Sequence, residues 1–203
     1  MVKYTITCPT TAAHPTNSAG QFVNFWWDNT PISTTPTSGD LAASARRAAR
    51  YFGNSTQASN VNAQYVIATP HGHNTADFTN GSICAWHWYT GWDSYGGYLP
   101  YTDLPYMPDN PNCGMNRVHA GSAGYLDGVT LVASHEYAES VTDPFMNAWM
   151  DENGASGETG DKCHFKDPGY ATDMSFLVDG KTMWFPVSPN WSNAVRGCVW
   201  WSY

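Results

Sequence analysis

Apolar residues recur at helical spacing over residues 41–52, which predicts an amphipathic helix in the first third of the chain. Leu41, Ala45 and Phe52 share one side of this helix, whereas its arginines fall elsewhere. Ser38 or Asp40 is expected to cap its start. Short runs rich in apolar and aromatic residues predict strands at residues 21–27 and 64–69.

A second helix is predicted from the apolar run at residues 128–134 onward. Asp127 is a suitable N-cap for this helix, and Pro144 is expected to stop it. No repeat or linker divides the chain, so we expect one domain over residues 1–203.

The second helix carries the sequence His-Glu-Tyr-Ala-Glu from His135 to Glu139. Residues at i and i+4 lie about 6 Å apart on one helix face, so these two side chains suit one metal ion, with Glu136 beside them. The pattern is one substitution from His-Glu-x-x-His, in which two histidines hold zinc and the glutamate is a general base. A third ligand must come from outside the helix. Glu158, which lies 158 − 135 = 23 residues after His135, or Asp161 can supply it.

The layout of residues 135–161 resembles that of the thermolysin-like gluzincins. In that family a glutamate about two dozen residues after the motif is the third zinc ligand, and a later aspartate orients a ligand histidine. Glu158 and Asp161 occupy those places, and Glu139 is the departure from the family pattern. The resemblance implies an α+β, zincin-like fold with a small mixed sheet and an active-site helix, arranged as an upper lobe, 1–126, and a lower lobe, 127–203.

The chain also resembles secreted bacterial and fungal proteins that are distantly similar to plant phosphate-induced, exordium-like proteins. This resemblance covers roughly residues 60–200 and includes the sequence Cys-Ala-Trp-His at residues 84–87. His87 therefore ranks first among the histidines outside the motif as a further catalytic residue. In zincin-like proteases an edge strand pairs with the substrate, and residues 84–89 are expected to take that place. Ordinary packing of their aromatic side chains is the alternative.

These residues predict a secreted zinc endopeptidase that acts on protein or peptide substrates. Zinc held by His135, Glu139 and Glu158 would polarise a water molecule, and Glu136 would deprotonate it during attack on a peptide carbonyl. Since carboxyl groups have reference pKa values near 4.3, we expect metal binding and activity to persist into mild acid. The run Asp-Asn-Pro-Asn at residues 109–112 offers oxygen ligands for calcium, although it also has the composition of a plain turn.

Composition limits the other classes of function. The net charge is −8 and only 13% of the 203 residues are charged, so the chain lacks the basic surface of a nucleic-acid binder or of a protein held on anionic lipid. Its apolar runs are far shorter than the roughly 18 residues of a membrane span. The start of the chain is polar and lacks the apolar segment of a secretory signal. We expect a monomer.

Five cysteines without Cys-x-x-Cys spacing favour disulfides, which form in oxidising compartments. Order along the chain favours Cys84 with Cys113 and Cys163 with Cys198, and leaves Cys8 unpaired, although spacing alone does not determine connectivity.

Two other classes of function stay open. Ten tryptophans and twelve tyrosines also suit a carbohydrate-binding or cell-wall protein whose motif helix is only structural. The third class is a metal hydrolase that does not act on peptides.

Overall fold

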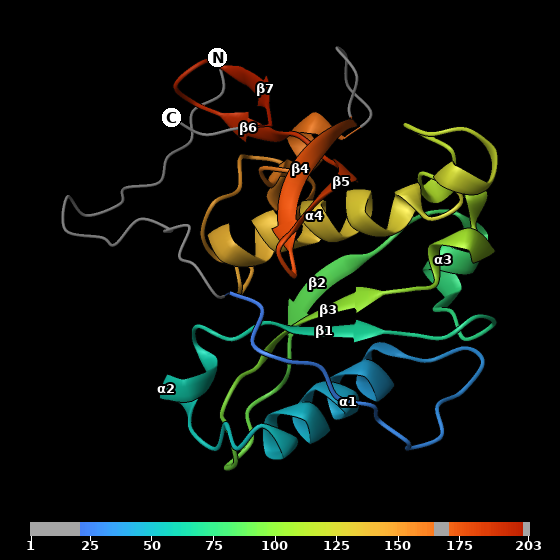
Figure 1. The fold of residues 1–203 in the computed structure, drawn as a ribbon. Coiled ribbons are helices and arrows are strands. Elements are labelled where there is room, and N and C mark those ends of the chain that lie inside the picture. Colours follow the sequence, from blue (N-terminus) through green and yellow to red (C-terminus); the bar gives the residue numbers. More distant parts are fainter. Residues whose placement is uncertain (1–20, 165–170, 201–203) are drawn as a thin grey trace.

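The computed structural model describes residues 21–164 and 171–200, which form a mixed α+β fold with small sheets (Figure 1). The helices are α1 Ser38–Tyr51, α2 Gln57–Asn60, α3 Ala76–Asn80 and α4 Asp127–Thr142. The strands are β1 Tyr65–Ala68, β2 Trp86–Tyr89, β3 Pro100–Leu104, β4 Thr172–Val178, β5 Lys181–Val187, β6 Asn190–Ser192 and β7 Gly197–Val199. Short 3₁₀ turns are η1 Met107–Asp109, η2 Pro111–Cys113, η3 Gly121–Gly124, η4 Gly154–Gly157 and η5 Asp161–Cys163.

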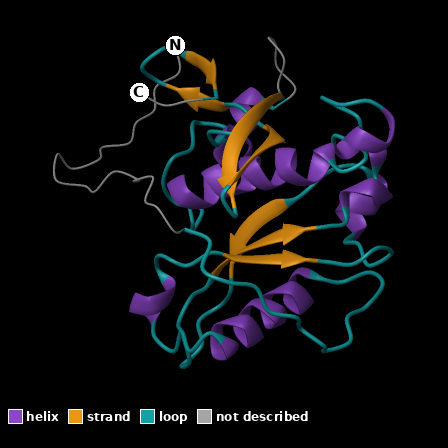
Figure 2. Ribbon diagram, viewed as in Figure 1, coloured by secondary structure: helices purple, strands orange, loops and turns teal. Residues whose placement is uncertain are grey.

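The central sheet has three strands in the order β1-β3-β2. The middle strand β3 pairs parallel with β1 and antiparallel with β2, which confirms the expected small mixed sheet. Helix α1 packs on one face and α4 on the other, while β5 of the β4–β5 hairpin contacts α4 (Figure 2). Helix α4 therefore lies between the sheet and the hairpin, so much of its surface is buried.

The predicted helix at residues 41–52 is confirmed as α1. Its cap is Thr37, not Ser38 or Asp40, because Thr37 and Asp40 bond each other's backbone N–H groups in a reciprocal capping box. Leu41 and Ala45 lie in a buried cluster that also contains Ala49, Tyr65, Leu99 and Tyr101.

The predicted strand at residues 64–69 is confirmed as β1, whereas the predicted strand at residues 21–27 is wrong. The latter segment is irregular and has no strand partner in the described parts of the chain. Four of its large apolar side chains are exposed: Phe22, Val23, Phe25 and Trp27. Trp26 instead stacks on Tyr51 at the end of α1, with 5.0 Å between ring centroids. Strand propensity without a neighbouring backbone edge is insufficient to form a strand.

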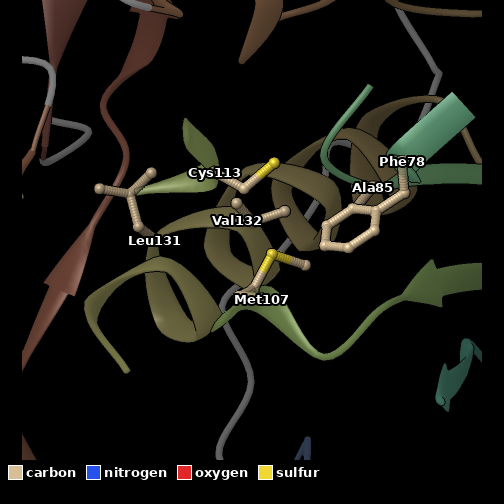
Figure 3. Close-up of a cluster of buried hydrophobic side chains, with 6 residues drawn as sticks. All are labelled: Phe78, Ala85, Met107, Cys113, Leu131 and Val132. Atoms are coloured by element: carbon tan, nitrogen blue, oxygen red, sulfur yellow. The ribbon is translucent and has the colours of Figure 1, made fainter. Parts of the chain in front are cut away.

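The motif helix α4 has nearly the predicted bounds and ends before Pro144. Asp127 is its first helical residue instead of its cap, and the Asp127 carboxylate accepts hydrogen bonds from the backbone N–H groups of Val118 and His119 at 2.8 and 2.7 Å. Leu131 and Val132 place α4 against a buried cluster that also contains Phe78, Ala85, Met107 and Cys113 (Figure 3).

Both predicted disulfides are present, Cys84 with Cys113 and Cys163 with Cys198. Cys8 lies outside the described residues. The first bridge ties the start of β2 to the η2 turn, and the second ties the η5 turn to β7. Within the described ranges, no helix is long and apolar enough to cross a membrane.

Candidate metal centre

Helix α4 buries three polar side chains of its motif: His135, Glu136 and Glu139. Burial of such groups is costly unless they are paired or hold a cation. Their partners come from β2 and from the chain segment that follows η4, so three separate elements build the site.

The segment at residues 158–161 runs directly over the motif. Glu139 Oε1 accepts hydrogen bonds from the backbone N–H groups of Gly160 and Asp161, at 3.1 and 2.9 Å. Gly160 leaves no room for a side chain, because a Cβ atom there would lie 2.7 Å from His135 Nδ1 and 2.8 Å from Glu139 Oε1. This glycine is thus required for the close approach of the segment to α4.

One group of possible metal ligands consists of His135, Glu139 and Asp161, and we name it the outer triad. His135 Nε2 lies 3.2 Å from Glu139 Oε1 and 3.3 Å from Asp161 Oδ1. Ligands about 2.1 Å from a tetrahedral zinc ion lie about 3.4 Å apart, so this spacing suits zinc. The Asp161 side chain is 32% exposed, which connects the outer triad to solvent.

A second group consists of His87, Glu139 and Glu158, and we name it the inner triad. His87 Nε2 lies 3.4 Å from Glu158 Oε1, and His87 Nδ1 lies 3.8 Å from Glu139 Oε2. The three side chains are no more than 4% exposed. Glu158 Oε1 accepts no hydrogen bond from the described residues, so a buried oxygen faces this group without a donor. An unsatisfied buried acceptor beside an imidazole fits a metal site.

The structure brings all the predicted site residues into one cluster: His87, His135, Glu136, Glu139, Glu158 and Asp161. It groups the ligands around the two histidines differently from the expectation. The expected ligand set joined Glu158 to His135 and Glu139; instead Asp161 lies beside His135, and Glu158 lies beside His87. Glu136 Oε2, expected to act as the base, lies 3.5 Å from His87 Nδ1.

The electrostatics of the metal-free centre favour bound protons. Burial opposes protonation of His87, but its hydrogen bond to Glu136 and the nearby carboxylates outweigh burial and raise the pKa of His87 to about 9. Burial, with the charge of Glu139, raises the pKa of Glu158 to about 8. Burial also raises the pKa of Glu136. For His135, burial is outweighed by Asp161 and Glu139, which hold its pKa well above the ordinary value. A metal ion would replace protons in this cluster.

Two buried aspartates near the centre were missed by the sequence analysis. The Asp143 carbonyl accepts a hydrogen bond from His87 Nε2 at 3.1 Å, and its carboxylate accepts the backbone N–H groups of Asn147 and Ala148. A backbone carbonyl is a common partner for the second nitrogen of a metal-binding histidine. Burial raises the pKa of Asp103, on β3, to about 7. The Asp-Pro pair after the helix was a signal for Asp143, whereas nothing local distinguishes Asp103.

The other histidines mostly tie loops together. His119 bonds Asp127 and Asp173, and His73 contacts the Ser33 carbonyl oxygen. His71 pairs with Asp109, whose second oxygen accepts the N–H groups of Gly72 and Asn74. Protein donors therefore occupy the carboxylate of the 109–112 run, and calcium binding there stays a prediction. The His164 ring lies 5.5 Å from the ring of His135.

Among curated proteins, Protein EXORDIUM-like 5 of Arabidopsis thaliana is 27% identical to the chain over 164 residues. The match covers 71% of this chain and 43% of the plant protein, so the chain spans less than half the length of that relative. No protein-family model matches the chain, and no solved structure matches it. The plant match supports the exordium-like similarity found in the sequence.

Proposed function

We propose that this protein is a secreted, zinc-dependent endopeptidase whose catalytic metal is held by the outer triad. The observation that carries the proposal is the buried cluster of histidines and carboxylates around α4. In the described part of the chain, the ion pairs of Glu136, Glu139, Glu158 and Asp161 are all with histidines. A catalytic metal also needs an open position for water and substrate. The exposure of Asp161 favours the outer triad for that role.

The residues of the centre have distinct roles in this proposal. His135, Glu139 and Asp161 would hold zinc, which supplies Lewis acidity and lowers the pKa of a bound water toward about 7. Glu136 accepts the proton of the attacking water, and its raised pKa brings it nearer to the working pH of a general base. The two backbone N–H groups on Glu139 Oε1 fix the orientation of that carboxylate.

The arrangement of elements supports a zincin-like fold and a peptide substrate. Helix α4 packs against β2 and β3 of the sheet. Strand β2 is an antiparallel edge strand, and its residue His87 points toward the motif on α4. An edge strand can pair with an extended peptide by backbone hydrogen bonds. The two disulfides favour an oxidising compartment, in agreement with secretion.

Metal analysis followed by digestion tests this function. Protein purified without added zinc should contain zinc, and the zinc-loaded protein should cleave an unfolded protein substrate. The variant Glu136→Gln, which lacks the proposed base, should bind zinc but lose this activity. The variant Glu152→Gln makes the same change at an exposed turn and should remain active, so it is the matched control. Zinc-loaded wild-type protein that leaves peptides intact but hydrolyses esters or phosphate esters would instead identify a non-peptidase metal hydrolase.

A cleft on the other side of β2 favours a second candidate function, the binding of a carbohydrate. The cleft has a volume of about 630 Å³ and is lined by aromatic rings and by hydroxyl groups, including those of Trp86, Trp88, Thr37, Thr75 and Thr90. Trp86 and Trp88 alternate with His87 on β2, so they face away from the metal centre. Aromatic faces with a few polar groups are typical of ligand pockets.

Tryptophan fluorescence during titration with soluble cell-wall glycans tests the second candidate. Trp88→Ala should abolish the binding signal, whereas Trp184→Ala, an exposed tryptophan on β5, should preserve it. Equal binding by both variants would exclude the cleft as the binding site.

A further inference from the structure

Glu139 belongs to both triads and presents a different oxygen to each. His135 Nε2 lies 3.2 Å from Glu139 Oε1, and His87 Nδ1 lies 3.8 Å from Glu139 Oε2. A carboxylate placed between two histidines in this way has the arrangement of a bridging ligand. The backbone N–H groups of Gly160 and Asp161 hold Oε1 in place, so the carboxylate is already oriented.

We propose that the centre binds two divalent ions, one in each triad, with Glu139 as the shared ligand. This inference deepens the proposed function, because the outer ion would be the catalytic zinc of that proposal. His87 and Glu158 complete the inner site, and His135 and Asp161 complete the outer site.

The inner triad has the features of a metal site in its own right. His87 Nε2 donates a hydrogen bond to the Asp143 carbonyl, so Nδ1 is left as the unprotonated nitrogen of the neutral ring. That nitrogen faces Glu136 Oε2 at 3.5 Å and Glu139 Oε2 at 3.8 Å. A ring nitrogen that faces two carboxylate oxygens needs a positive partner, either a proton or a metal ion, and in the neutral ring that partner would be the metal ion. Glu158 Oε1 lies nearer to the other ring nitrogen, 3.4 Å from Nε2, and lacks a hydrogen-bond donor among the described residues. Ligand atoms of His87, Glu139 and Glu158 nevertheless lie within 4.8 Å of one another, so Glu158 is the third candidate ligand of the inner site.

Charge balance also favours two ions over one. Six carboxylates lie in or beside the centre: Asp103, Glu136, Glu139, Asp143, Glu158 and Asp161. Their full charge is −6, and histidines that bind metal are neutral. One divalent ion leaves −4 in a largely buried cluster, whereas two leave −2. Because uncompensated buried charge is strongly unfavourable, the second ion stabilises the ionised cluster.

The two sites should differ in exchange rate. The inner side chains are no more than 4% exposed, whereas the Asp161 side chain is 32% exposed. A chelator should therefore remove the outer ion first and the inner ion slowly.

Metal stoichiometry of the full chain tests the inference without relying on activity. Zinc-loaded wild-type protein, freed of excess metal, should contain two zinc ions per chain by plasma mass spectrometry. Glu158→Gln and Asp161→Asn should each contain one, and Glu152→Gln, the exposed control, should contain two. Titration of the wild-type protein with Co²⁺ gives the same count without any variant, and magnetic coupling in its EPR spectrum reports the shared ligand.

Each other outcome has a defined meaning. One ion per chain, lost in Asp161→Asn and kept in Glu158→Gln, would overturn the inner site but leave the proposed function standing. If the wild-type chain binds one ion and only Glu158→Gln loses it, both the two-ion centre and the proposed catalytic role of the outer triad are overturned. A wild-type chain that binds no zinc would overturn both proposals. Two ions without magnetic coupling would overturn the bridging role of Glu139.

Discussion

At the scale of single residues, the centre depends on how Glu139 is held. Helical spacing places Glu139 one turn from His135, but the segment at residues 160–161 decides which way its oxygens face. A histidine at this position, as in the gluzincin motif, lacks two oxygens that can face separate groups. The glutamate therefore changes the chemistry of the centre as well as its charge.

Replacement of the proposed base should remove activity and leave metal binding intact. Glu136→Gln is nearly isosteric but cannot accept a proton, so we expect the rate of peptide hydrolysis to fall at least about 100-fold. Zinc content and the circular dichroism spectrum should match those of the wild type. Undiminished proteolysis in this variant would remove Glu136 from the mechanism.

Replacement of Gly160 should disturb the centre through steric conflict alone. In Gly160→Ala, the new Cβ atom would meet His135 and Glu139 at less than 3 Å, so the segment must move away from α4. We expect zinc affinity to fall about 10- to 100-fold, as it does when the support of a ligand is lost. The control is Gly39→Ala, whose Cβ would make only an ordinary contact at 3.5 Å. Competition with a chromophoric chelator measures the zinc affinity of both variants. Equal affinities would contradict the steric argument.

At the scale of elements, the sheet delivers His87 and the hairpin covers the helix. His87 pairs in register with Thr102 on the central strand, which directs its side chain toward α4. The β4–β5 hairpin is tied to the start of α4 through His119, which contacts Asp127 Oδ1 at 2.7 Å and Asp173 Oδ2 at 2.9 Å. This histidine thus joins two elements that are distant in sequence.

The His119 link should stabilise the fold in a pH-dependent way. The hydrogen bond to Asp127 raises the pKa of His119 above its ordinary value of 6.5. The folded chain therefore holds this proton more tightly than the unfolded chain, and the stabilisation is complete below about pH 6.5 and is lost as pH rises through the folded pKa. The loss of unfolding free energy in His119→Gln should be larger at pH 6 than at pH 9.

Urea denaturation at the two pH values measures this difference. Gln64→Ala removes the hydrogen bond from Gln64 Nε2 to Thr102 Oγ1 at 2.6 Å, in which neither group titrates, so this variant is the control and should show no such trend. An effect of His119→Gln that grows with pH would reverse the sign and reject the assignment.

At the scale of the whole molecule, the metal-free chain should become less stable as pH rises from 6.5 to 9. The raised pKa values of His87, about 9, Glu158, about 8, and Asp103, about 7, mean that folding takes up protons across this range. His164 has a pKa lowered to about 4, mainly by burial, so it opposes this trend only up to about pH 7.5, where the unfolded histidine has lost most of its proton. Zinc should restore Tm at pH 9 because it binds the folded state. A metal-free Tm that rises with pH would contradict this expectation.

Zinc affinity itself should weaken toward acid. The reference pKa values of carboxyl groups lead to the expectation that zinc stays bound in mild acid. In the metal-free centre, however, the raised pKa values of His87, about 9, and Glu158, about 8, mean that zinc must displace protons from both groups. The dissociation constant should therefore be larger at pH 6 than at pH 8. Equal values measured by calorimetry at the two pH values would support the original expectation.

The sequence by itself determined the local features of this protein. The two stretches predicted as helices became α1 and α4, the apolar run became β1, and the order of cysteines matched both bridges in the described residues. The His135 and Glu139 pair could be placed because one helix turn sets its geometry. The structure of residues 21–27 could not be predicted correctly, because a strand depends on a partner strand that the local sequence does not specify.

Only the tertiary structure decided how the centre is divided. His87 and Glu139 are separated by 139 − 87 = 52 positions in the sequence, and the register of β2 on β3 and the packing of α4 on both strands bring them together. Glu158 and Asp161 are three residues apart yet face different histidines, and Gly160 between them lies against His135 and Glu139. Spacing constrains residues within one element, whereas contacts between elements depend on packing of the whole chain.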